Sequence, residues 1–530
     1  MSRVIFDNTP TAPVFNPVRA DIACFVGLAR VLKGASLSPS LTSWLNSLFF
    51  PAAAIRAVTN VPVLIEHYSA FAAIFDDGSA GDGFGTDYLA AAVRSFFAQG
   101  GKRCYVVCVD EPITPSDSTS IKAAKLNKIL PNTGFAPDAP STWTGVSCLG
   151  VLEDVSFLVT PDLPALCASE PVGALGQTPV TPTGPEEFVV CSQGDVTPRQ
   201  RRTFPSPAPT LKFSDYSLWA GNVAAILNYL STGVLTHQLH LREVQFVAAF
   251  PIPQEMDSAT AAENPSSTEI GQDVHAVIGA HMPENVLDVG AASSANISSS
   301  FLQLSYPWLK TSGSGVLLES LEPPDGVLAG LLARNALTRG TFASATKVIP
   351  AETYDVAPPL PAQEMKSSAT LDWGPTALPK PLIERFSLFG FTPLGLRLLS
   401  DVTAYPGESY RSGPVNRLAS VICRAAREMG QSVVFQSNDP ALWGRVKRLL
   451  QNLMTRLWSL NALDGATAAD AFSVRCDQSA MTQNDLDNGR LIAYVTFTAA
   501  ATIETITVRL AMETSGTTTQ EIAANAAGVL

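Results

Sequence analysis

Apolar runs of two kinds alternate along the first two thirds of the chain, and this alternation constrains the fold more than any other feature. Residues 88–101 read "YLAAAVRSFFAQGG", a helical pattern closed by two glycines, and residues 102–110 read "KRCYVVCVD", a run typical of a buried strand. Similar strand-like runs are "VPVLIEH", "VLEDVSFLVTPDL", "REVQFVAAFPI" and "SSFLQLSYPWL", and further helical patterns are "SLWAGNVAAILNYLS" and "PPDGVLAGLLARNAL". Strands and helices that alternate in this way predict an α/β fold.

The length of the chain predicts more than one domain. Its 530 residues exceed the roughly 250–300 residues at which a single core stops growing. Seven prolines between residues 348 and 381 indicate a linker. We expect an extended N-terminal arm (1–20), an α/β domain (21–347) with insertions near 168–218 and 253–300, the linker (348–381), an α+β C-terminal domain (382–511) that contains a helix at 440–461 and a terminal strand, and a flexible tail (512–530).

The composition favours a structural protein. Charged residues make up 15% of the chain, against roughly 25% in an average soluble protein. Few charges suit a surface that is packed against neighbours, although long uncharged loops would give the same number. The eight cysteines form no CxxC pair, which favours reduced thiols over a disulfide framework. With no secretory signal pattern and no apolar run of membrane-spanning length, we expect assembly in the cytoplasm and no direct membrane insertion.

One basic helix stands out in this acidic chain of net charge −12. The stretch Asp439–Gly465 reads "DPALWGRVKRLLQNLMTRLWSLNALDG" and has no carboxylate between Pro440 and Leu463. Asp439 is a good N-cap, and Pro440 suits the first helical position. At about 100° per residue, the predicted buried face comprises Trp443, Val446, Leu449, Leu450, Leu453, Met454, Leu457 and Leu460. The predicted outer face comprises Arg445, Arg448, Asn452, Thr455, Arg456 and Ser459.

The outer face of this helix predicts an acidic partner. A solvated surface helix normally mixes both signs of charge to form i,i+4 pairs, and this one lacks the acids. An amphipathic helix that simply faces water is the alternative. Nucleic acid and an acidic protein surface would both complement four cations. We favour protein, because the domain is not basic overall and the chain has no zinc-finger spacing or RNP-type strand.

A search for catalytic, cofactor-binding and metal-ligating residues gives none. Gly78, Gly81, Gly83 and Gly85 precede a predicted helix, but their spacing matches neither GxGxxG nor a P-loop. His237 and His240 have the spacing of two ligands on a helix, without a third ligand nearby. We therefore expect no enzymatic activity, no cofactor and no metal site.

Several motifs resemble the contractile tail sheath proteins of phages, R-type pyocins and extracellular contractile injection systems. The N-terminal ones are "VPVLIEHYSAFAAIFDDG", "LAAAVRSFFAQGGKRCYVVCV", "WTGVSCLGVLEDVSFLVTPDL", "SYPWLK" and "PPDGVLAGLLAR". The C-terminal one runs from "VVFQSNDPALWGRVKRLLQNLMTRLWSLNALDG" through "AFSVRCDQSAMTQNDLDNGRL" and is similar to the family nearly element for element. The resemblance covers most of the chain.

The resemblance implies a mechanical polymer without enzymatic activity. Sheath subunits form stacked six-membered rings around an inner tube, with the α/β domain outside and the C-terminal domain inside. Arg445, Arg448, Asn452 and Arg456 would face the tube. The terminal arms would add strands to neighbouring subunits, through Val4, Ile5 and Phe6 at one end and Ile506, Val508 and Leu510 at the other.

The implied partners are other copies of the chain, the inner tube protein, and baseplate and terminal cap proteins, with no nucleic acid. The parent particle would drive its tube through a target envelope on contraction, and it would be either released from the cell or anchored at a membrane. Two alternatives stay open from the residues alone. One is an α/β enzyme with an active site that sequence patterns do not identify, and the other is a non-contractile shell protein.

Overall fold

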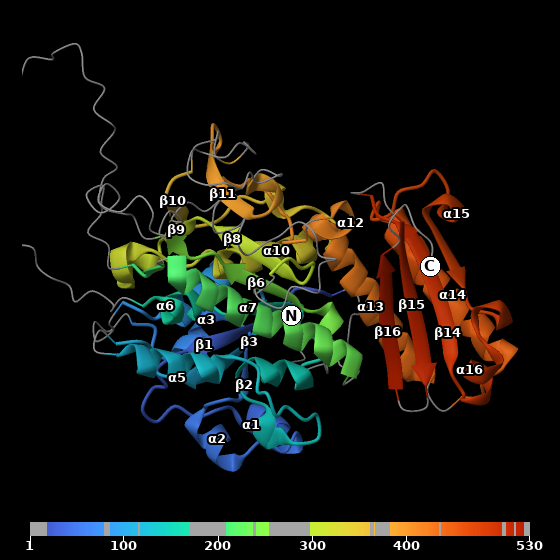
Figure 1. Cartoon of the computed structure of the whole chain (residues 1–530), viewed down its shortest axis with the longest axis horizontal. Helices are drawn as coiled ribbons and strands as arrows, with labels where there is room; N and C mark the ends of the chain where they lie inside the picture. Colours follow the sequence, from blue (N-terminus) through green and yellow to red (C-terminus); the bar gives the residue numbers. More distant parts are fainter. Residues whose placement is uncertain are drawn as a thin grey trace, which may run out of the picture. The chain divides into compact units, whose positions relative to one another are not determined.

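The computed structural model describes residues 19–78, 85–114, 117–169, 208–211, 213–236, 240–253, 297–360, 365, 382–405, 407–433, 436–500, 505–513 and 516–523. These residues form two compact units (Figure 1). The α/β unit comprises the described residues between Asp21 and Asn416, and the C-terminal unit comprises those from Arg417 onward together with Arg19 and Ala20.

An eight-stranded mixed sheet forms the centre of the α/β unit. Its strand order is β12-β11-β8-β6-β4-β1-β3-β2. The bounds are β1 (Ala23–Leu28), β2 (Pro62–Ile65), β3 (Cys104–Asp110), β4 (Phe157–Val159), β6 (Gln245–Ala249), β8 (Leu302–Tyr306), β11 (Ser387–Thr392) and β12 (Gly395–Leu398). The six inner strands run parallel, whereas β2 and β12 are antiparallel to their neighbours. The α/β fold expected from the alternating runs is confirmed.

Helices cover both faces of this sheet because its inner strands are apolar on both sides. In β1, Cys24, Val26 and Leu28 belong to one buried cluster, and Ala23 and Phe25 belong to the other. The first cluster includes α5 (Thr119–Ile129), α6 (Leu163–Cys167) and α7 (Phe213–Thr236), and the second includes α1 (Pro39–Ser47), α2 (Ala52–Ala57), α3 (Tyr68–Ala72), α4 (Tyr88–Ala98) and α10 (Asp325–Thr338). Because successive side chains of a strand point to opposite faces of the sheet, the core consists of two layers, one on each face.

Two glycines let α10 lie close against α4. A Cβ atom built on Gly326 would be 2.5 Å from the Ala92 Cα atom, and one on Gly330 would be 2.7 Å from the Phe96 carbonyl oxygen. Because these glycines and their partners both have i,i+4 spacing, one side of each helix forms a continuous contact. Together with its contacts to β4, β6 and β8, this contact buries nearly all of α10 between Asp325 and Asn335.

The hairpin of β11 and β12 differs from the predicted domain division. The sequence analysis placed residues 382–511 together, but Ser387 and Leu388 of β11 pair with Ser305 and Tyr306 of β8. The hairpin thus extends the large sheet, and the α/β unit continues to Asn416. An apolar strand pattern does not reveal its partner, and this pairing joins positions more than 80 residues apart in the chain.

Part of the predicted linker is also a strand, because β10 (Thr353–Ala357) pairs antiparallel with β9 (Trp308–Thr311). A second two-stranded sheet lies outside the linker, where β5 (Thr210–Leu211) pairs with β7 (Ile252–Pro253). Most of the predicted insertions, residues 170–207 and 254–296, lie outside the described residues, as does the N-terminal arm up to residue 18.

The C-terminal unit consists of helices and an antiparallel sheet of order β13-β14-β15-β16. Its strands are β13 (Phe472–Arg475), β14 (Leu491–Thr498), β15 (Thr505–Glu513) and β16 (Gly516–Ala523), and its helices are α14 (Pro440–Ser459), α15 (Ala468–Ala471) and α16 (Gln483–Asp487). The long α13 (Gly413–Val433) begins in the α/β unit after α12 (Glu408–Arg411) and continues into this one. α14 packs on β13 and β14.

β16 lies where the sequence analysis expected a flexible tail from residue 512. It pairs with β15 from Glu513↔Gly516 to Ile506↔Ala523. The small, polar composition of residues 512–530 suggested a loose segment, whereas the consecutive Thr517, Thr518 and Thr519 are β-branched and suit a strand once a partner is adjacent.

Candidate functional site

The candidate site is the outer face of α14, and local signals at both ends define the helix. The Asp439 carboxylate accepts a hydrogen bond from the Leu442 amide (2.8 Å), and Pro440 occupies the first turn. At the other end Asn461 adopts a left-handed φ of 59°, and the Ala462 amide donates to the Leu457 carbonyl (3.0 Å). The helix therefore ends at Ser459, two residues before the predicted boundary at 461.

One side of α14 is buried in the C-terminal unit. The buried residues are Leu442, Val446, Leu450, Leu453, Met454 and Leu457. Leu449 and Leu460, which were predicted to be buried, are 37% and 49% exposed. At about 100° per residue both lie at the margin of the buried stripe, beside the arginines. They add apolar area to the outer face, which the sequence analysis had treated as purely polar.

The four predicted contact residues lie together on the exposed side. Arg445, Arg448, Asn452 and Arg456 are all exposed and are spaced three, four and four residues apart. This spacing aligns them within a narrow row of about 16 Å along the helix. In the part of the chain that the structure describes, no carboxylate forms an ion pair with any of the three arginines. With respect to the described residues, the row thus presents positive charge without acidic partners.

Lys447 has a different environment. It is half-buried, and its charge lies near Cys476 and Asp477. The pKa of Asp477 is lowered, mainly by the Ser479 hydroxyl, which donates to it at 2.5 Å, and further by Lys447 and Arg475. This lysine is therefore partly compensated within the unit, which sets it apart from the arginine row.

The predicted arm residues are only partly described. Val4, Ile5 and Phe6 lie outside the described residues. Ile506, Val508 and Leu510 belong to β15, where they pair with Phe497, Val495 and Ala493 of β14. β15 also pairs with β16, so these positions form an inner strand of the chain's own sheet. Whether neighbouring copies exchange strands stays a prediction, for which β13 and β16 are the sheet edges.

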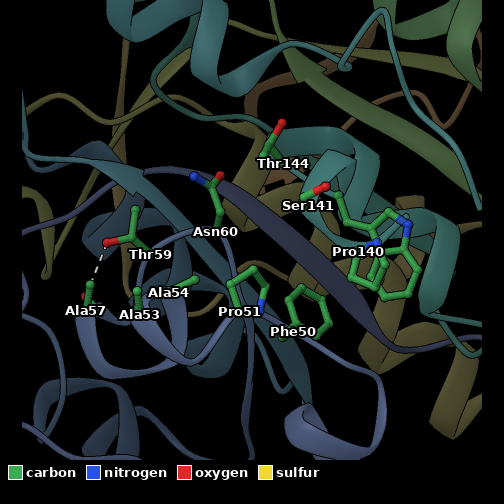
Figure 2. A pocket seen from close by; sticks show the side chains of 11 residues that line it. Phe50, Pro51, Ala53, Ala54, Ala57, Thr59, Asn60, Pro140, Ser141 and Thr144 are labelled. Carbon is green, nitrogen blue, oxygen red and sulfur yellow. Dashed lines mark hydrogen bonds between the residues drawn. The ribbon is translucent and has the colours of Figure 1, made fainter. Parts of the chain in front are cut away.

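A pocket of about 350 Å³ offers no catalytic chemistry. It is lined by Phe50, Pro51, Ala53, Ala54, Ala57, Thr59, Asn60, Pro140, Ser141, Trp143 and Thr144 (Figure 2). None of these side chains titrates near neutral pH, so the pocket holds no general acid, general base or thiolate.

Three buried carboxyl groups lie elsewhere in the α/β unit, near the ends of its parallel strands. Glu322 accepts a hydrogen bond from the Ser95 hydroxyl (2.6 Å), and Asp162 accepts one from the Leu28 amide (2.8 Å). Burial raises the pKa of Glu322 to about 8 and that of Asp325 to about 7, and it holds the pKa of Asp162 well above its ordinary value. None of the three lines the pocket.

The remaining candidates from the sequence are structural where they are described. His240 lies with its Nε2 atom 2.6 Å from the Leu152 carbonyl oxygen, while His237 lies outside the described residues. Across the described ranges, no group of three His, Cys, Asp or Glu side chains could hold a metal ion. Within the same ranges, no helix has the length and apolarity needed to span a membrane.

Comparison with known proteins gives a family model that matches one segment of the chain and solved structures that are similar to the whole fold. Residues 406–513, which include α14, match the family model of the phage tail sheath C-terminal domain. No curated protein matches the chain. A chain of the anti-feeding prophage baseplate in its contracted state is similar over 94% of each chain, with 15% identity and a TM-score of 0.53. A chain of the 6-fold symmetrised baseplate of the same particle is similar over 94% of each chain, with 17% identity and a TM-score of 0.50.

Proposed function

We propose that this protein, a member of the contractile tail sheath family, is the repeating structural subunit of a contractile sheath. The observation that carries the proposal is the family match over residues 406–513, because this segment includes the helix with the uncompensated arginine row. The similarity of the whole fold to chains of a contractile particle supports the same role.

The subunits assemble as stacked six-membered rings around an inner tube, between a baseplate and a terminal cap. The 6-fold symmetry of one similar particle supports the ring. Assembly takes place in the cytoplasm, and the particle is then released or anchored at a membrane. The protein works without a catalytic centre or cofactor and binds protein rather than nucleic acid. The stroke drives the tube through a target envelope.

The arginine row of α14 faces the tube and meets acidic groups on it. Exposed ion pairs contribute only about 0–1 kcal/mol each and weaken in salt. Several weak contacts per subunit hold the tube in the extended state and release it when the ring widens. Leu449 and Leu460, half-exposed beside the row, give this contact an apolar margin that excludes water.

Charge reversal on α14 tests the tube contact. Arg445→Glu, Arg448→Glu and Arg456→Glu together leave the buried face intact, so we expect the subunit to fold and to polymerise alone into tubes. Assembly around the inner tube should fall sharply because like charges now oppose each other. Electron microscopy of particles co-expressed with the tube protein measures the fraction of filled, extended sheaths.

A matched control reverses three exposed basic residues of the α/β unit, Lys33, Lys102 and Arg334, to Glu. It changes the net charge by the same amount and should leave filling unchanged. Filled sheaths at normal yield in the α14 variant would refute the tube contact. Unmodified protein that remains monomeric over a wide range of concentration and salt would refute the sheath role itself.

Deletion of residues 1–8 tests the N-terminal arm. If Val4, Ile5 and Phe6 add a strand to a neighbouring subunit, their loss removes backbone hydrogen bonds between copies and none within the described fold. We expect a folded subunit, judged by circular dichroism, that no longer forms ordered tubes. Tubes of normal appearance would exclude the arm.

A further inference from the structure

The pocket in the α/β unit has an apolar floor and a small rim. Phe50 and Trp143 form the floor, with ring centroids 5.3 Å apart in an edge-to-face arrangement. Ala53, Ala54 and Ala57 of α2 line one side, and the turn at residues 140–144 lines the other (Figure 2). At about 350 Å³ the pocket is near the lower limit of small-molecule sites, which suits one or two bulky side chains.

The backbone around the pocket is held in an uncommon conformation. Seven non-glycine residues of the described chain have positive φ, and Phe49, Val58 and Asn60 flank this pocket. Such residues cost free energy and persist where the surroundings fix them, often at binding surfaces. Phe49 directly precedes the lining residue Phe50 in the chain, and its side chain is 80% exposed. An exposed aromatic ring is therefore next in sequence to the apolar lining of the pocket.

A protruding apolar tip lies at the β11–β12 hairpin. Phe391 and Leu394 are 58% and 75% exposed. The Thr392 hydroxyl fixes the two-residue turn, because it donates to the Gly395 carbonyl (2.8 Å) and accepts from the Leu394 amide (3.2 Å). Gly395 adopts a φ of +100°, which the turn requires. These two hydrogen bonds give the tip a defined turn conformation.

The hairpin tip and the pocket lie at opposite edges of the same sheet. The hairpin ends in β12, the strand at one edge. The pocket lies beside β2 at the other edge, where the Asn60 amide donates to the Cys108 carbonyl (2.8 Å) two residues before the strand begins. Seven strand spacings of about 4.8 Å place the edges roughly 34 Å apart. One copy cannot fill its own pocket with its own hairpin.

We propose that the β11–β12 hairpin tip of one copy enters the Phe50–Trp143 pocket of the next copy. The occupant is a second copy because neither surface carries a charge: the pocket lining and the turn Thr392–Gly395 are both neutral in a chain of net charge −12. These are places where two acidic copies can approach without repulsion. Because the hairpin tip and the pocket are different surfaces of one molecule, their contact is head-to-tail, and contacts of this kind propagate into rings or helices.

This contact rests on the proposed self-assembly of the protein, and cysteine pairs test it separately. A chain with Leu394→Cys and Ala54→Cys, in a Cys191→Ser background, is assembled and then oxidised. The other seven cysteines are buried and are not expected to react. We expect a ladder of dimers, trimers and longer covalent species on a non-reducing gel. Each single variant should stop at dimers at most, and a mixture of the two should give dimers.

The control pairs Ala54→Cys with Leu337→Cys, an exposed leucine on α10 at a site unrelated to the hairpin. It should give no ladder. Normal tubes without a ladder in the Leu394/Ala54 variant would overturn this contact and leave the sheath role intact. A ladder without tubes would support the contact and overturn the sheath role. Absence of both would overturn both.

A charge at the tip gives a second measurement that does not depend on oxidation. Leu394→Asp places a carboxylate where the proposed contact needs an apolar group, so tube formation should be lost or shifted to higher protein concentration. Leu337→Asp should leave it unchanged. Equal thermal midpoints of the two unassembled variants would show that both are folded. Equal tube formation by both would contradict the contact.

Discussion

The helices α10 and α14 differ in how much of their surface is buried. The residues of α10 mainly stabilise the fold, whereas the exposed residues of α14 are available for contacts with other proteins. α10 is buried along most of its length, meets α4 through Gly326 and Gly330, and is preceded by the buried Glu322. α14 is buried on one side and presents arginines without acidic partners among the described residues on the other. Substitutions on the buried side of α10 should change stability, and those on the outer face of α14 should change assembly.

The largest expected effect is on the pH dependence of stability near α10. Burial raises the pKa of Glu322 to about 8; nearby Asp325 adds to the rise, while hydrogen bonds from Ser95 and Thr311, and the charge of Arg94, oppose it. The folded protein therefore keeps a proton that the unfolded chain loses above its ordinary carboxyl range. The contribution of Glu322 to the free energy of unfolding is therefore fully present below its ordinary carboxyl pKa and falls as pH rises toward about 8.

Glu322→Gln should make the fall of stability with pH smaller, since the amide has no proton to lose, while the raised pKa values of Asp325 and Asp162 keep part of it. At about 1.4 kcal/mol per pKa unit, the gain over the unmodified protein at pH 8 is on the order of a few kcal/mol. Chemical unfolding between pH 5 and pH 8.5 measures it, with Glu111→Gln at an exposed position as the control. Parallel pH profiles for Glu322→Gln and the unmodified protein would show that burial of this group does not control stability.

The next effect concerns the contact between α10 and α4. Gly330→Ala places a methyl group about where the Phe96 carbonyl already is, so one helix must move. Overpacking of this kind costs roughly 1–3 kcal/mol, more than the helix propensity gained. Thermal unfolding should show a lower midpoint. A higher midpoint would mean that the two helices separate at little cost.

The smallest expected effect is an increase in stability, on the exposed side of α14, and it contrasts with the loss expected in α10. Gly444 in α14 has no atom within 4 Å of an added Cβ atom. Gly444→Ala should therefore stabilise the protein by about 0.5–1 kcal/mol through helix propensity alone. The same unfolding measurement applies. A loss of stability here would show that the outer side of α14 is more closely packed than the described residues indicate.

The sequence predicted α14 well because its signals are local. Asp439 and Pro440 marked its start, and the apolar period selected five of the six buried side chains but not Leu442. Leu449 and Leu460 were assigned to the wrong side because the period gives a direction but not the width of the covering sheet. The arginine row was found because the missing acids are visible in the sequence itself.

Features that depend on distant parts of the chain were missed. The pocket joins α2 to a turn about 85 residues later, and no residue in either segment indicates the other. No pattern in the sequence singled out Phe391 and Leu394, and only the pairings of β11 with β8 and β12 place them near the edge of the sheet. Local pattern predicts elements, whereas the partner of an element is decided by the packing of the whole unit.

The distance between hairpin tip and pocket also determines how defective copies behave in a mixture. On the proposed contact, a copy with a damaged tip and an intact pocket still accepts one neighbour but offers nothing to the other. Such a copy terminates the polymer that incorporates it, so a minor fraction shortens every particle. A copy that fails to fold is not incorporated into the polymer, so it does not shorten the particles.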